Sequence, residues 1–205
     1  MALTDEKGPG EMNPPQLETR RLILRRFTRQ DIDALYAILS DKEVNTFLPW
    51  FPVTSMEEAA RFYEERFAAS DGKPQAHNYA VCRKEDNIPI GYVTVKADDS
   101  YDLGYGLRKE FWRQGIATEA ARAVVEQAGR EGIPYITATH DVNNPRSGAV
   151  MRRVGMQYQY SYEELVQPKN QLVTFRLYQK NLDGACGRVF RRYWECSRVH
   201  FIESF

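Results

Sequence analysis

Residues 111–128, FWRQGIATEAARAVVEQA, carry an apolar pattern with the period of an α-helix. Six small apolar residues lie at spacings of three and four: Ala117, Ala120, Ala121, Val124, Val125 and Ala128. This spacing predicts a helix with one buried face, which ends at the glycines and proline of residues 129–134. Such a helix needs an apolar surface to cover, and strand-like segments stand on both sides of it.

The order of these segments predicts the fold class. Capping-box pairs at Thr28–Asp31 and Ser55–Glu58 predict two helices before the first hairpin. Strands are expected at residues 21–27, 79–83, 90–96, 101–107, 135–139, 156–162 and 173–178, and a short helix starts at Asn144. The order β-α-α-β-β-β-α-β-α-β-β predicts one α/β domain at residues 17–180, with a mixed, mostly antiparallel sheet flanked by helices.

The two ends of the chain lie outside this pattern. Residues 1–16 are polar, contain three prolines and two glycines, and are expected to form a flexible tail. Residues 181–205 form a C-terminal extension in which basic and aromatic residues alternate. Packing of the extension against its own domain or a partner subunit is favoured over stacking on RNA, although both interpretations fit the pattern.

Composition excludes several classes of function. The formal net charge is zero, which argues against a protein that grips nucleic acid by its phosphates. No apolar run approaches the roughly 20 residues of a membrane span. The three cysteines form no C-x-x-C pair, which favours a reduced, cytoplasmic setting. The three histidines have no zinc-site spacing, so no metal is expected.

The start of the 117–128 helix has the features of an anion site. A helix N-terminus exposes about four unpaired N–H groups and a positive dipole end. Gly115 and Ala117 leave that backbone open to a phosphate. The preceding strand places Gly104 and Gly106 on one face, so bare backbone leads into the helix. Neither G-x-x-x-x-G-K-[ST] nor G-x-G-x-x-G is present, and the pattern fits a ligand with an amide-bearing arm and a pyrophosphate.

Three segments resemble a known family: LETRRLILRRF, LGYGLRKEFWRQGIATEAARAVV and NNPRSGAVMRRVGM. Together they resemble the GCN5-related N-acetyltransferases (GNAT family), and within them the ribosomal-protein alanine acetyltransferase branch. The resemblance covers roughly residues 17–180. Two positions depart from the family pattern. Trp112 stands where the motif has glutamine or arginine, and Gly106 stands where an aromatic residue is expected after LGY.

The resemblance implies acetyl-CoA as the donor, and transfer of its acetyl group to a primary amine by direct attack in a ternary complex. The acceptor is a protein N-terminus or a small-molecule amine. Backbone amides are expected to bind the pyrophosphate, at Arg113, Gln114, Gly115, Ile116, Ala117 and Thr118. The pantetheine arm is expected to pair with Gly106, Leu107 and Arg108, with the acetyl carbonyl at an N–H near Leu107.

The resemblance also assigns candidate side chains. It places Asn144 near the pantetheine, although asparagine before proline is also a favoured helix N-cap. It places Ser147 near the sulfur as a proton donor, with a merely exposed serine as the alternative. Glu163 and Glu164 are candidate bases expected after the penultimate strand, or else solvated loop residues.

The remaining candidates are less specific. Trp50 and Phe51 either line the acceptor side or fill the core. His140 either relays a proton or is a satisfied surface histidine, and residues 152–153 are arginines that either meet the 3′-phosphate of CoA or are solvated. A non-catalytic acyl-CoA-binding sensor or scaffold is the alternative function. No nucleic acid or membrane partner is expected, and a homodimer is left open.

Overall fold

The computed structural model describes residues 15–70 and 77–204 and contains two β-sheets. The first has the order β1-β2-β3-β4-β5 and the second the order β6-β8-β7-β9. The strands of the first sheet are β1 (Leu17–Glu18), β2 (Leu22–Arg25), β3 (His77–Arg83), β4 (Pro89–Val95) and β5 (Leu103–Leu107). Those of the second are β6 (Tyr135–Asp141), β7 (Gln157–Val166), β8 (Gln171–Asn181) and β9 (His200–Phe201). Of the predicted tail, residues 1–14 lie outside the described residues.

The two sheets meet at strands β5 and β6 and then diverge. A single parallel bridge joins Asp102 to Thr137, where the Thr137 N–H donates to the Tyr101 carbonyl at 3.3 Å. All strand pairs inside the two sheets are antiparallel. The prediction of a mixed, mostly antiparallel sheet is therefore confirmed. Beyond the bridge, the edge of β5 that faces β6 carries no partner strand in the described sheets.

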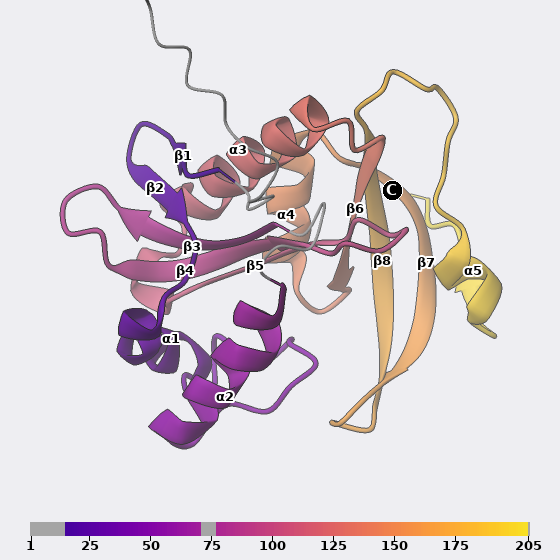
Figure 1. Ribbon diagram of the computed structural model, residues 1–205. Helices are drawn as coiled ribbons and strands as arrows, with labels where there is room; N and C mark the ends of the chain where they lie inside the picture. Colours follow the sequence, from indigo (N-terminus) through magenta and orange to yellow (C-terminus); the bar gives the residue numbers. More distant parts are fainter. Residues whose placement is uncertain (1–14, 71–76, 205) are drawn as a thin grey trace, which may run out of the picture.

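Helices cover both faces of the first sheet (Figure 1). Helices α1 (Ile32–Leu39) and α2 (Met56–Arg66) lie on one face, and α3 (Ile116–Arg130) and α4 (Pro145–Val154) lie on the other. The predicted apolar stripe of α3 is buried at Ala120, Ala121, Val124, Val125 and Ala128, with Ile116 in place of the half-buried Ala117. The core thus forms as two layers separated by the sheet.

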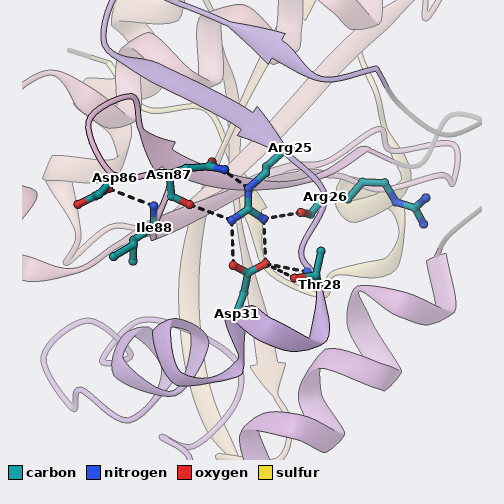
Figure 2. Close-up of polar contacts among 7 residues, drawn as sticks. All are labelled: Arg25, Arg26, Thr28, Asp31, Asp86, Asn87 and Ile88. Atoms are coloured by element: carbon teal, nitrogen blue, oxygen red, sulfur yellow. Dashed lines mark hydrogen bonds and ion pairs between the residues drawn. The ribbon is translucent and has the colours of Figure 1, made fainter.

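A partly buried ion pair attaches α1 to the sheet (Figure 2). Arg25 on β2 binds both carboxylate oxygens of Asp31, at 2.8 and 2.9 Å, and also the side chain and carbonyl of Asn87. The Thr28 N–H donates to the same carboxylate at 2.8 Å, as the predicted capping box requires. Burial acts to raise the pKa of Asp31, but the bonds from Arg25 and Thr28 outweigh it and hold the pKa below its usual value.

The C-terminal extension packs on the second sheet. It contains helix α5 (Arg192–Cys196) and strand β9, neither of which was predicted. Its aromatic residues join those of the sheet in one cluster, made of Tyr160, Tyr162, Leu177 and Phe190 with Tyr193 and Trp194 against it. The Tyr193 ring stacks on Tyr162 at 5.1 Å. The aromatic spacing of this segment therefore reflects packing within the chain.

Candidate active site

The loop before α3 has the backbone of an anion site. Arg113 and Gly115 have φ angles of 61° and 75°, in the left-handed region. Left-handed residues within a turn direct successive N–H groups into one concavity, which favours an anion. Gly115 is the N-cap of α3, so the first-turn amides of residues 116–118 have no carbonyl one turn earlier in the helix to bind. The loop predicted to bind a pyrophosphate therefore combines a left-handed turn with unpaired first-turn amides.

The Arg21 side chain, from the turn between β1 and β2, links this loop to the first turn of α3. Its guanidinium donates to the Gln114 carbonyl at 3.0 Å and to the Glu119 carboxylate at 2.7 Å. Glu119 also accepts from the Thr19 hydroxyl at 2.6 Å. Burial acts to raise the pKa of Glu119, but the hydrogen bonds from Thr19 and Arg21 outweigh burial, so the pKa lies below its usual value. Arg21 thereby offsets the negative charge of Glu119, which lies in the first turn of the helix predicted to bind an anion. This pairing could not be predicted from the sequence, because Arg21 and Glu119 lie far apart along the chain.

An open groove of about 620 Å³ begins at Gly115 and follows the outer side of α3. Two arginines line it, Arg122 from α3 and Arg153 from α4, and Arg122 donates to the Arg153 carbonyl at 2.9 Å. Arg152 is directed elsewhere, since it donates to the Tyr178 hydroxyl at 3.0 Å. Of the two predicted phosphate-binding arginines, the groove thus includes Arg153, and it adds Arg122, which the sequence analysis missed.

The register of β5 shows which amides face the open edge. The Arg108 N–H donates to the Ile90 carbonyl at 2.9 Å, and the Lys96 N–H donates to Asp102 at 3.2 Å. Because antiparallel partners alternate along a ladder, the even-numbered residues of β5, including Gly106, direct their N–H and C=O groups toward β4. Tyr105 and Leu107 direct theirs away from β4. Of the three residues predicted to pair with pantetheine, only Leu107 directs its N–H toward the open edge of β5. Tyr105, which was not predicted, directs a second N–H toward the same edge.

The two departures from the family pattern have structural causes. The Trp112 indole N–H donates to the Leu107 carbonyl at 2.8 Å, which fixes the turn between β5 and α3. At Gly106, a Cβ atom would lie 2.7–2.9 Å from the Tyr92 ring and hydroxyl. Tyr92 is its direct partner on β4. The aromatic group expected at residue 106 is therefore absent because an aromatic side chain from β4 occupies that space.

The start of α4 lies against β5. Asn144 is the N-cap, and its side chain accepts from the Ser147 N–H at 3.4 Å. The Tyr105 hydroxyl donates to the Ser147 carbonyl at 2.8 Å and lies 2.9 Å from Ser147 Oγ. Burial raises the pKa of Tyr105, so its hydroxyl remains protonated. Asn144 and Ser147 thus lie where the two sheets diverge, and Tyr105 joins them to β5.

The two acidic candidates lie within a strand. The prediction that Glu163 and Glu164 follow the strand is wrong, because β7 runs to Val166 and pairs both with β8. Strand alternation puts them on opposite faces, with Glu164 on the face of Tyr162. Burial raises the pKa of Asp102, to which the charge of Glu164 adds, while Lys96 opposes the shift. The charge of Glu164 thus acts on Asp102 from the Tyr162 face of β7, whereas Glu163 lies on the other face.

The two candidates for the acceptor side, Trp50 and Phe51, differ in their surroundings. Trp50 is half-buried, packs edge-on against Phe62 at 5.1 Å, and donates from its indole to Asn45 at 3.1 Å. Phe51 is 60% exposed and lines an open groove of about 390 Å³ along α2. Lys169, in the β7–β8 turn, donates to the Asn45 carbonyl at 3.1 Å. The segment between α1 and α2, residues 40–55, therefore contacts the β7–β8 hairpin of the second sheet.

His140 is not a surface residue. It is buried under α4, and its Nδ1 contacts the Asp141 carbonyl at 2.8 Å.

Two further expectations from the sequence concern absences. Within the described ranges, 15–70 and 77–204, no cluster of three metal-ligating side chains occurs. The same part of the chain contains no helix that is both long and apolar enough to cross a membrane.

Known proteins match this architecture. Residues 21–157 match the family model of the acetyltransferase (GNAT) domain. The uncharacterized N-acetyltransferase YoaA of Bacillus subtilis (strain 168) is 30% identical over 159 residues, which cover 73% of this chain and 89% of that protein. Two solved structures share the fold. A GNAT-family acetyltransferase from Bacillus anthracis has a TM-score of 0.72 at 22% identity, covering 82% of this chain and 99% of that chain. RimL, a ribosomal L7/L12 alpha-N-protein acetyltransferase in complex with coenzyme A, has a TM-score of 0.71 at 23% identity, covering 82% and 97%. The chain belongs to the GNAT family of acetyltransferases and is an acyltransferase.

Proposed function

We propose that this acetyltransferase uses acetyl-CoA to acetylate a primary amine, and that the preferred acceptor is an α-amino group. The observation that carries the donor assignment is the left-handed loop at Arg113 and Gly115, which leads into α3 beside the open edge of β5. The coenzyme A complex of RimL, which shares the fold, supports the same donor. Membership of an acetyltransferase family favours turnover over a non-catalytic acyl-CoA-binding role.

The described residues fit each part of the donor. The amides of residues 113–118 would receive the diphosphate, and Arg122 and Arg153 in the adjoining groove would receive the 3′-phosphate. The outward N–H groups of Tyr105 and Leu107 would pair with the pantetheine arm and the acetyl carbonyl. One well-placed oxyanion donor contributes about 2.7–4 kcal/mol, and holding the two reactants together contributes roughly 7–11 kcal/mol. Positioning therefore supplies most of the rate.

The proton steps need modest help. The attacking nitrogen forms a bond to the acetyl carbon, the carbon–sulfur bond breaks, and the nitrogen loses a proton. We assign the proton acceptor to Glu164, on the face of β7 toward Asp102. Ser147, held by Tyr105, would donate a hydrogen bond to the departing sulfur, with Asn144 beside the arm. An α-amino group titrates at about 7.7–8.0 and a lysine at about 10.4, so a weakly assisted site favours the α-amino group.

Release of thiol from acetyl-CoA tests this proposal. The panel contains three sets of acceptors. The first is lysine-containing peptides with a free N-terminus, the second is the same peptides with a formylated N-terminus, and the third is small primary amines. We expect turnover with free N-termini and none with the formylated matches. Turnover of the formylated, lysine-containing peptides would contradict the α-amino preference. Turnover only with small amines would move the acceptor to that class, and a lack of any acetyl-CoA binding would contradict the donor assignment.

A further inference from the structure

Tyr92 carries a buried hydroxyl without a partner. The side chain is 5% exposed, and among the described residues no atom hydrogen-bonds its Oη. Nearly all buried hydroxyls in folded proteins have a partner, so each exception needs an explanation. Packing does not supply one, since a phenylalanine would fill the same space against Phe67, whose ring centre lies 6.3 Å away. The hydroxyl is therefore retained at a cost that the fold itself does not explain.

The position of the Tyr92 hydroxyl accounts for its lack of a hydrogen-bond partner. Tyr92 and Gly106 are direct partners on β4 and β5, and the distal half of the ring lies over Gly106. The Oη lies 2.9 Å from the position that a Gly106 Cβ would occupy. The hydroxyl thus lies over β5 at Gly106, on the face of α1 and α2. It lies beside the stretch of strand whose outward N–H groups, at Tyr105 and Leu107, face the open edge.

Resting on the proposed function, we propose that Tyr92 is a catalytic residue whose hydroxyl donates a hydrogen bond to the thioester carbonyl oxygen of acetyl-CoA. When the amine adds to the carbonyl carbon, the electron pair of the C=O bond moves to this oxygen, and the Tyr92 O–H and a β5 N–H stabilise the charge together. The pair returns as the carbon–sulfur bond breaks, the nitrogen has lost its proton to Glu164, and the sulfur gains a hydrogen bond from Ser147. Tyr92 keeps its own proton throughout, in keeping with a pKa that burial raises.

The substitution Tyr92→Phe keeps the ring over Gly106 and removes only the hydroxyl. The matched control is Tyr160→Phe, in which a buried hydroxyl that donates to the Phe190 carbonyl at 2.8 Å is lost instead. Calorimetry measures the dissociation constants of acetyl-CoA and of CoA for the wild type and both variants, and thermal unfolding is recorded alongside.

We expect Tyr92→Phe to weaken acetyl-CoA binding about two- to tenfold, as the loss of one hydrogen bond does, and to leave CoA binding unchanged. Its melting temperature is expected to equal or exceed that of the wild type, because an unsatisfied group is removed. Tyr160→Phe should lower the melting temperature and change neither affinity. With acetyl-CoA labelled by carbon-13 at the carbonyl, the bound C=O stretch should move to higher frequency in Tyr92→Phe.

Two outcomes overturn the inference while the proposed function stands. One is an unchanged ratio of acetyl-CoA to CoA affinity in Tyr92→Phe, and the other is a loss of stability like that of Tyr160→Phe with no shift in the carbonyl stretch. If the wild type binds neither acetyl-CoA nor CoA, the proposed function fails and the role of Tyr92 fails with it.

Discussion

The hydroxyl of Tyr105 on β5 lies 2.8 Å from the carbonyl oxygen and 2.9 Å from the Oγ of Ser147 on α4. This contact joins the strand that carries the outward N–H groups to the helix that carries the proposed thiol partner. It orients the Ser147 side chain, while the Asn144 side chain accepts from the Ser147 N–H.

Ser147→Ala should lower kcat about tenfold and leave KM for acetyl-CoA nearly unchanged, because the serine acts on the departing sulfur and that thiolate needs only modest stabilisation. Steady-state kinetics with the best acceptor of the amine panel measure this. Ser197→Ala, in the C-terminal extension, is the control and should leave both parameters at wild-type values. An unaltered kcat in Ser147→Ala would remove the serine from the mechanism.

Tyr105→Phe should reduce stability by about 1 kcal/mol through the lost hydrogen bond and should also reduce kcat, since Ser147 loses its orienting partner. Urea unfolding and the same kinetic assay measure the two effects. A stability loss with full activity would show that this contact is structural only.

Arg21→Ala should weaken CoA binding roughly tenfold, because the Glu119 carboxylate then stands uncompensated beside the diphosphate amides. The double variant Arg21→Ala/Glu119→Gln should recover most of the affinity. Calorimetry with CoA measures both. The charge argument fails if the double variant binds as weakly as the single one, since the arginine would then act only by holding the loop at Gln114.

Gly115→Ala should cost about 1–2 kcal/mol and weaken CoA binding, because alanine disfavours φ near 75° although its Cβ would have room, at 3.7 Å from Arg21. Gly132→Ala is the matched control beyond the other end of α3, at φ 83° with nothing within 4 Å. It should lower stability similarly and leave CoA binding intact. Equal effects of the two variants on CoA affinity would contradict a role for the loop geometry.

The ion pair between Arg25 and Asp31 should make stability depend on acid. The folded-state pKa of Asp31 is lowered, so its contribution is present above the unfolded value of about 3.9 and is lost as the pH falls through the folded value. Asp31→Asn should cost about 3 kcal/mol at pH 7, since it leaves the half-buried Arg25 guanidinium without its partner's charge, and less near pH 3. Chemical unfolding of both proteins at the two pH values tests this. A difference that does not shrink in acid would contradict the linkage.

Local patterns predicted much of this fold and less of the site. The stripe of α3 and the Thr28–Asp31 capping box follow from local spacing, and both are present in the structure. Of the Ser55–Glu58 box only the Ser55 cap forms, because the Glu58 carboxylate accepts from the Thr54 N–H instead. Trp112 and Gly106 could not be interpreted from the sequence, because their reasons are the Leu107 carbonyl and the Tyr92 ring, which only strand pairing brings near. The C-terminal end of β7 was missed for a related reason. Glu163 and Glu164 resemble loop residues, yet the hairpin with β8 pairs their backbones and places their side chains on its two opposite faces.

A crystal structure with acetyl-CoA bound tests the central claim most directly. The account predicts the diphosphate within hydrogen-bond distance of the backbone N–H groups of residues 113–118, and the thioester at the outward edge of β5, beside the N–H groups of Tyr105 and Leu107 and within reach of Ser147. A coenzyme docked on another surface, or crystals and solution calorimetry that both show no uptake, would contradict it.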